Sequence, residues 1–121
     1  MNVLLIEDNY DLRESLQVLL ELELHPTTIA ESRDDALTLF AKNPKSFDWI
    51  ISDYMMPGLE MPPFVDEVRK LRPDIPIAVY SASMDLVDDI KKGLPKEGIY
   101  YLKKPGLDGL WELLKSPRPF A

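Results

Sequence analysis

Acidic, hydroxyl and basic side chains stand at or just after the ends of four short apolar segments of this chain. They are Glu7, Asp8, Asp53, Ser81 and Lys104. Carboxylates brought to one point repel one another unless a cation joins them, and hard oxygen ligands that leave room for water suit Mg²⁺. A hydroxyl and an ammonium opposite the acids can hold a phosphoryl group. A carboxylate can also accept phosphate itself, as an acyl phosphate.

Each of these residues, taken alone, has an ordinary structural explanation. An Asp after a strand is usually a cap or a turn residue, and Asp8 directly precedes Asn9, which can cap a helix. A Ser at a strand end usually bonds to nearby backbone, and a Lys before Pro is usually on the surface. The chemistry therefore depends on whether the fold brings this matched set together.

The apolar segments have the character of parallel strands. Val3–Ile6 is a continuous apolar run without alternation, as expected for a strand covered on both faces. Trp49–Asp53 is aromatic and β-branched, ends on its carboxylate and is followed by the turn signal Met-Met-Pro-Gly. Further strands are predicted at Thr27–Ala30, Ile75–Tyr80 and Ile99–Leu102, the first of them nearer an edge of the sheet.

Apolar residues between these strands recur at the helical period. Asn9 and Ser32 are predicted to cap the first two helices, and the adjacent prolines Pro62 and Pro63 suit the first turn of the third. Two more helices are predicted over about residues 84–92 and 107–114.

This alternation predicts an α/β fold with a doubly wound, five-stranded parallel sheet and helices on both faces. Right-handed crossovers leave few topologies, and the flavodoxin-like strand order 2-1-3-4-5 is the common small one. In that order the first and third strands flank the switch point, where ligands bind at the carboxyl edge. Four strand ends would then bring the acids, the hydroxyl and the ammonium to one place. This convergence favours a shared functional site over four unrelated structural roles.

The length and composition of the chain exclude several classes of function. The 121 residues fit one domain over residues 1–115, followed by a Pro-rich tail over 116–121. The absence of cysteine excludes disulfides, thiolate metal sites and Cys nucleophiles. A net charge of −7 argues against direct nucleic-acid binding by this domain. No apolar segment approaches the length of a membrane span, so we expect no membrane association and a cytoplasmic location.

Four motifs, in order and at characteristic spacing, carry a family resemblance. They are Leu5–Asn9, Ser52–Gly58, Tyr80–Ala82 and Tyr101–Pro105. Over residues 1 to about 115, the chain resembles the receiver domain of two-component response regulators, the chemotaxis regulators among them. The resemblance implies a Mg²⁺-dependent phosphorylation switch that receives its phosphoryl group from a sensor histidine kinase or a phosphotransfer protein.

The resemblance also implies the metal ligands. Asp8 and Asp53 would ligate Mg²⁺ together with the backbone carbonyl of Met55, while Glu7 would act through water. Asp53 would be the phosphoryl acceptor. The expected enzymatic chemistry is therefore confined to phosphorylation and dephosphorylation of Asp53, with no dedicated substrate turnover.

The remaining family roles fall on the last two strands. Ser81 would contact the phosphoryl group and Lys104 would pair with it. Tyr101 occupies the place of the aromatic switch residue, with Tyr100 as a competitor that strand alternation puts on the opposite face. The switch would change the surface of the fourth helix, the fifth strand and the last helix, and so regulate an output partner or effector domain.

Three stretches depart from the family pattern. They are Leu59–Pro63, Gly93–Gly98 and Gly106. These departures keep open an alternative, a receiver-like protein-binding module that is regulated without phosphorylation. A carboxylate-nucleophile phosphatase is disfavoured because Met55 stands where such enzymes carry their general acid. A flavin-mononucleotide binder is disfavoured because an acid cluster facing the phosphate repels it.

Overall fold

The computed structural model of the chain describes residues 2–54, 56, 58–81 and 98–103, with the backbone alone at 81, 102 and 103. Its strands form one five-stranded parallel sheet in the order β2-β1-β3-β4-β5, which confirms the predicted topology. The strands are β1 (Val3–Ile6), β2 (Thr27–Ala30), β3 (Trp49–Asp53), β4 (Ile77–Ser81) and β5 (Ile99–Lys103). The described helices are α1 (Tyr10–Leu22), α2 (Arg33–Lys42) and α3 (Met61–Leu71), with a short 3₁₀ turn, η1 (Pro44–Ser46).

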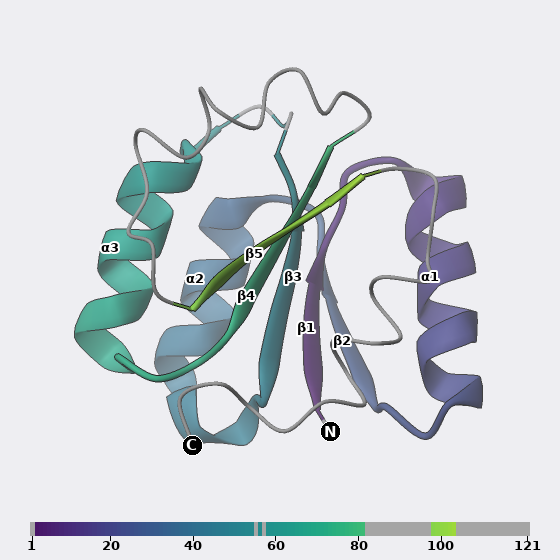
Figure 1. Cartoon of the computed structure of the whole chain (residues 1–121), viewed down its shortest axis with the longest axis horizontal. Coiled ribbons are helices and arrows are strands. Elements are labelled where there is room, and N and C mark those ends of the chain that lie inside the picture. Colours follow the sequence, from purple (N-terminus) through teal and green to yellow (C-terminus); the bar gives the residue numbers. More distant parts are fainter. Residues whose placement is uncertain (1, 55, 57, 82–97, 104–121) are drawn as a thin grey trace.

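The described helices cover both faces of the sheet, with α1 on one face and α2 and α3 on the other (Figure 1). The predicted helices over 84–92 and 107–114 lie outside the described residues, as does the tail. No described helix has both the length and the apolar character that a membrane crossing requires.

Local sequence signals set the helix starts. Asn9 caps α1 by accepting a hydrogen bond from the backbone N–H of Leu12, and Ser32 caps α2 by accepting one from Asp35. Both bonds satisfy backbone donors that the first helical turn leaves without a partner. The first turn of α3 contains Pro62 and Pro63, whose missing N–H groups cost nothing there. All three predicted starts are confirmed.

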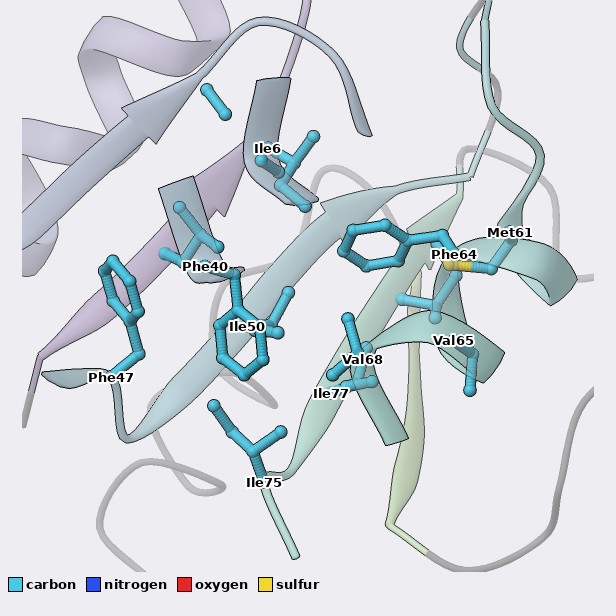
Figure 2. Packing of buried hydrophobic residues seen from close by; sticks show 14 of the residues in the cluster. Ile6, Phe40, Phe47, Ile50, Met61, Phe64, Val65, Val68, Ile75 and Ile77 are labelled. Carbon is cyan, nitrogen blue, oxygen red and sulfur yellow. The ribbon is translucent and has the colours of Figure 1, made fainter. Parts of the chain in front are cut away.

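Strand alternation divides the core into two clusters. On the α1 face, Leu16 and Leu20 pack with odd-numbered residues of β1 and β3 such as Leu5 and Trp49. On the α2–α3 face, even-numbered positions of the same strands, such as Ile50, pack with the two helices. Figure 2 shows this second cluster, in which Phe40 and Phe47 stack with ring centroids 6.1 Å apart. The sheet is therefore buried on both faces, as the uninterrupted apolar runs predicted.

The fourth strand starts later than the sequence suggested. Its ladder begins at Ile77 rather than Ile75, although Ile75 is fully buried. Pro76 lies between them, and its missing N–H cannot donate to a neighbouring strand. Its carbonyl still accepts a hydrogen bond of 3.1 Å from Ile50, so Pro76 stands just outside the ladder.

Candidate functional site

The strand register brings the predicted site residues to one edge of the sheet. Ile6 of β1 pairs with Ser52 of β3, so Glu7 comes level with Asp53, the last residue of β3. Asp53 in turn pairs with Tyr80 of β4. These three positions therefore lie next to one another across β1, β3 and β4, at the carboxyl edge where parallel α/β sheets bind ligands.

The three predicted carboxylates meet at this edge. Glu7, Asp8 and Asp53 each offer an oxygen atom within 4.8 Å of the other two. Glu7 and Asp53 are buried, whereas Asp8 is exposed. A set of hard oxygen donors with one open side suits Mg²⁺, which keeps several of its waters when it binds to proteins. The residues present therefore fit the predicted metal.

The structure describes the other predicted site residues only in part. Ser81 is the last residue of β4 and pairs in register with Lys103, so the backbone places the hydroxyl-bearing position one residue beyond the Asp53 pair. Lys104 and Met55 lie outside the described residues. The structure therefore brings Glu7, Asp8 and Asp53 together and leaves the roles of Ser81, Lys104 and Met55 as predictions.

Tyr100 and Tyr101 take opposite faces of β5, as alternation predicted. Tyr100 packs with Trp49 on the α1 face, with ring centroids 5.6 Å apart. Tyr101 is partly buried against the cluster on the α2–α3 face. Burial raises the pKa of each hydroxyl above its ordinary value.

Tyr80 is a site residue that the sequence did not reveal. It is 7% exposed, and its hydroxyl donates a hydrogen bond of 2.8 Å to Oε1 of Glu7. The backbone N–H of Asn9 donates to the other oxygen, Oε2, at 3.3 Å. Burial and then the nearby carboxylates, above all that of Glu7, raise the pKa of Tyr80 above its ordinary value, so this hydroxyl stays a neutral donor. Glu7 is thus held at both of its oxygens.

We predict that Tyr80→Phe destabilises the fold and weakens Mg²⁺ binding. The variant keeps the ring but leaves a buried oxygen of Glu7 without this donor. The loss of a hydrogen bond to a charged group lowers the free energy of unfolding by about 1.5–3 kcal/mol. Urea unfolding and titration calorimetry with MgCl₂ measure the two effects. Tyr100→Phe, on the neighbouring strand, is the control, and a Tyr80→Phe variant that matches it in both measurements would contradict this role.

Arg33 is the second residue that the sequence did not reveal. Its side chain comes from the first turn of α2, is 3% exposed, and donates from Nη1 to the backbone carbonyl of Asp53 at 2.8 Å. A cation in the first turn of a helix opposes the helix dipole. That unfavourable placement is the one local signal that could have indicated a special role for Arg33.

The comparisons with known proteins agree with this arrangement. The sequence model described as "Response regulator receiver domain" matches residues 3–115. The hydrogenase transcriptional regulatory protein HoxA of Cupriavidus necator is 36% identical over 104 residues, which cover 85% of this chain and 21% of that protein. The probable transcriptional regulator ycf27 of Cyanidium caldarium is 34% identical over 104 residues, or 86% of this chain and 40% of that protein. The chain thus spans less than half the length of these relatives.

Solved structures share the fold. The receiver domain of the hybrid histidine kinase CckA superposes with a TM-score of 0.79 at 24% identity, covering 95% of this chain and 96% of that one. The response regulator protein TrrA of Thermotoga maritima, solved in complex with Mg(2+)-BeF, gives a TM-score of 0.77 at 28% identity, covering 94% of this chain and 96% of that one.

Proposed function

This chain belongs to the response regulator receiver domain family, and we propose that it acts as a signalling switch that accepts a phosphoryl group on Asp53. The observation that carries this proposal is the convergence of Glu7, Asp8 and Asp53, whose ligand atoms lie within 4.8 Å of one another. Asp53 is the only one of the three that ends the central strand β3, and its backbone is held by neighbouring elements on both sides.

In the proposed reaction, a carboxylate oxygen of Asp53 attacks the phosphorus of a phosphohistidine on a sensor histidine kinase or phosphotransfer protein. The new P–O bond forms as the P–N bond breaks, and the donor imidazole takes the electron pair and a proton. Asp8 and Asp53 would hold Mg²⁺ with the carbonyl of Met55, and Glu7 would act through water. When bound, Mg²⁺ supplies positive charge that offsets the phosphoryl oxygens.

Two predicted residues complete this proposed site. The Ser81 hydroxyl would donate to a phosphoryl oxygen, and the Lys104 ammonium would pair with the added charge. The register supports both assignments, because Ser81 pairs with Lys103 and the next residue along the chain is Lys104.

We propose Tyr101 as the residue that carries the signal to the surface. Its position on the α2–α3 face, partly buried and opposite Val79 of β4, leaves it two residues from Ser81 in the register. A shift of Ser81 towards the phosphoryl group would make room for the Tyr101 ring. The surface formed by residues 84–92, β5 and residues 107–114 would then change and regulate an output partner or effector domain.

The proposal also concerns the kind of protein in which this switch would work. The matched segment covers 21% of HoxA and 40% of ycf27, so these relatives have room for an output domain outside it. The domain itself, with a net charge of −7, would not bind nucleic acid directly. The chemistry is self-phosphorylation and dephosphorylation without a dedicated substrate, and a cytoplasmic location stays part of the proposal.

Incubation with acetyl phosphate and MgCl₂ tests the proposed function directly. We expect an intact-mass increase of one phosphoryl group that requires Mg²⁺, disappears with excess chelator and is released by hydroxylamine, as an acyl phosphate is. Mass spectrometry before and after hydroxylamine makes the measurement. No adduct from acetyl phosphate or from any phosphohistidine donor would overturn the proposal and favour the binding module without phosphorylation, which the departures from the family pattern keep open.

A further inference from the structure

The segment between Asp53 and α3 is tied to α2 by side-chain hydrogen bonds. Its described part is Tyr54, Met56 and Gly58–Glu60. A connecting loop next to a site must be held by the surrounding scaffold if it is to keep one conformation. Two adjacent residues in the first turn of α2, Arg33 and Asp34, bind this segment through their side chains.

Arg33 bonds to both ends of the segment. Its Nε donates to the carbonyl of Leu59 at 2.6 Å, and its Nη1 donates to the carbonyl of Asp53 at 2.8 Å. Nη1 and Nη2 also lie 3.3 Å from the carbonyl of Tyr54. The planar, forked guanidinium can reach carbonyls on two sides at once, which a single ammonium cannot do in the same geometry.

Asp34 binds the other backbone polar group of Leu59. Its Oδ2 accepts a hydrogen bond of 3.1 Å from the backbone N–H of Leu59. Both polar groups of Leu59 are therefore bound by consecutive residues of α2. Gly58 permits this approach, because its φ of +92° suits glycine and an added Cβ would lie 2.7 Å from Oδ2 of Asp34.

The charge of Arg33 also acts on the acidic site. Desolvation lowers the pKa of the buried guanidinium, and the negative charge of Asp53 is the largest influence in the opposite direction. Arginine remains protonated in proteins even when it is buried. The positive charge of Arg33 therefore lies next to the backbone of Asp53 and offsets part of the repulsion among the three carboxylates.

We infer that Arg33 is a positioning residue for the phosphoryl-accepting site, through its bonds to the backbone of Asp53, Tyr54 and Leu59. This inference rests on the proposed function. On the side of β4, Asp53 and Tyr54 are held by the sheet, where the Tyr54 N–H donates to the carbonyl of Tyr80 at 3.0 Å. Arg33 supplies the matching support from α2, so the carboxylate of Asp53 is presented to the metal and the phosphoryl donor in one orientation.

The variant Arg33→Lys tests this role because it keeps the charge and removes the fork. Supporting residues around metal ligands typically contribute about 10- to 100-fold to metal affinity. We expect Arg33→Lys to raise the Mg²⁺ dissociation constant about 10-fold in titration calorimetry, and to raise the MgCl₂ concentration that half-saturates acetyl-phosphate labelling by the same factor. Labelling at saturating MgCl₂ should recover.

Arg69→Lys is the matched control. Arg69 is also partly buried and donates to two backbone carbonyls, those of Ile75 and Gly98, but at the opposite edge of the sheet, before β4 and β5 begin. Both variants should lower the urea midpoint. Only Arg33→Lys should weaken Mg²⁺ binding, so an equal weakening by Arg69→Lys would show a general loss of stability and overturn the inference.

The remaining outcomes separate this inference from the proposed function. If the wild type binds Mg²⁺ and becomes labelled, an unchanged Mg²⁺ affinity in Arg33→Lys would overturn this inference and leave the proposed function in place. Wild-type protein that neither binds Mg²⁺ nor becomes labelled would overturn the proposed function and the inference with it. If Arg33→Lys is too unstable in buffer alone, Arg33→Lys and Arg69→Lys are both titrated in trimethylamine N-oxide or sucrose, which stabilise the compact state. We expect the same weakening of about 10-fold in Arg33→Lys alone, and an unchanged affinity would overturn the inference.

Discussion

Asp53→Asn is expected to abolish phosphoryl acceptance completely while leaving the domain folded. The amide has nearly the same shape as the carboxylate but lacks the anionic oxygen that attacks phosphorus. The backbone bonds of residue 53 do not depend on the side chain, since its carbonyl accepts from Arg33 and from the Ser52 hydroxyl. Intact mass after incubation with acetyl phosphate and MgCl₂ measures the result, and far-UV circular dichroism checks the fold.

Asp66→Asn is the matched control for this change. Asp66 lies on the exposed face of α3, so the substitution removes the same charge without touching the acidic cluster. We expect it to be labelled like the wild type. An Asp53→Asn protein that still gains a phosphoryl group with hydroxylamine sensitivity would show that another carboxylate is the acceptor.

Asp53→Asn is also expected to affect the stability of the domain in the absence of metal. Asp53 shares a small space with Glu7 and Asp8, and removal of one negative charge reduces their mutual repulsion. In chelator, the urea midpoint of Asp53→Asn should therefore be at least as high as that of the wild type. A clear loss of stability would mean that favourable contacts of the carboxylate outweigh the repulsion.

Asp8→Asn is expected to weaken Mg²⁺ binding by at least about 10-fold, because loss of a metal ligand should cost no less than loss of a supporting residue. Asp8 is exposed, so its substitution removes little packing. At 100 times its dissociation constant, Mg²⁺ should stabilise the wild type by about 2.7 kcal/mol. At the same MgCl₂ concentration, a 10-fold weaker affinity would leave about 1.4 kcal/mol, so Asp8→Asn should lose about half of that gain or more. Urea unfolding with and without MgCl₂ measures the difference.

Asp11→Asn controls for general charge effects near the same edge. Asp11 is an exposed acid in the first turn of α1, three residues along the chain from Asp8. It should keep the wild-type response to Mg²⁺. Equal losses in the two variants would indicate diffuse attraction of cations by an acidic surface, rather than ligation at the sheet edge.

Local patterns were sufficient to predict the strands and helices that the structure describes, and the strand order followed from common topology rules. Val3–Ile6 and Trp49–Ile51 are too uniformly apolar for a half-exposed strand, which implied a sheet covered on both faces. Asn9 and Ser32 mark helix starts through bonds to residues three positions away, so their signal lies within one turn.

The end of a helix, and the face that its last residues take, were less predictable. Leu71 falls on the same helical period as the buried residues Phe64 and Val68, but it is 43% exposed. It is the last residue of the helix, and the chain leaves the sheet face there through Arg72. Arg72 donates to the carbonyls of Pro44 and Phe47, contacts that no helical periodicity encodes.

The strand order and the meeting of Glu7, Asp8 and Asp53 could be predicted, because right-handed crossovers leave few topologies and parallel strands share one carboxyl edge. The contacts that support these carboxylates could not be predicted. Tyr80 reaches Glu7 from 73 residues away, and Arg33 reaches Asp53 from 20. Such bonds depend on how strands and helices pack in space, and neither residue type nor spacing along the chain records which buried oxygen a distant donor will meet.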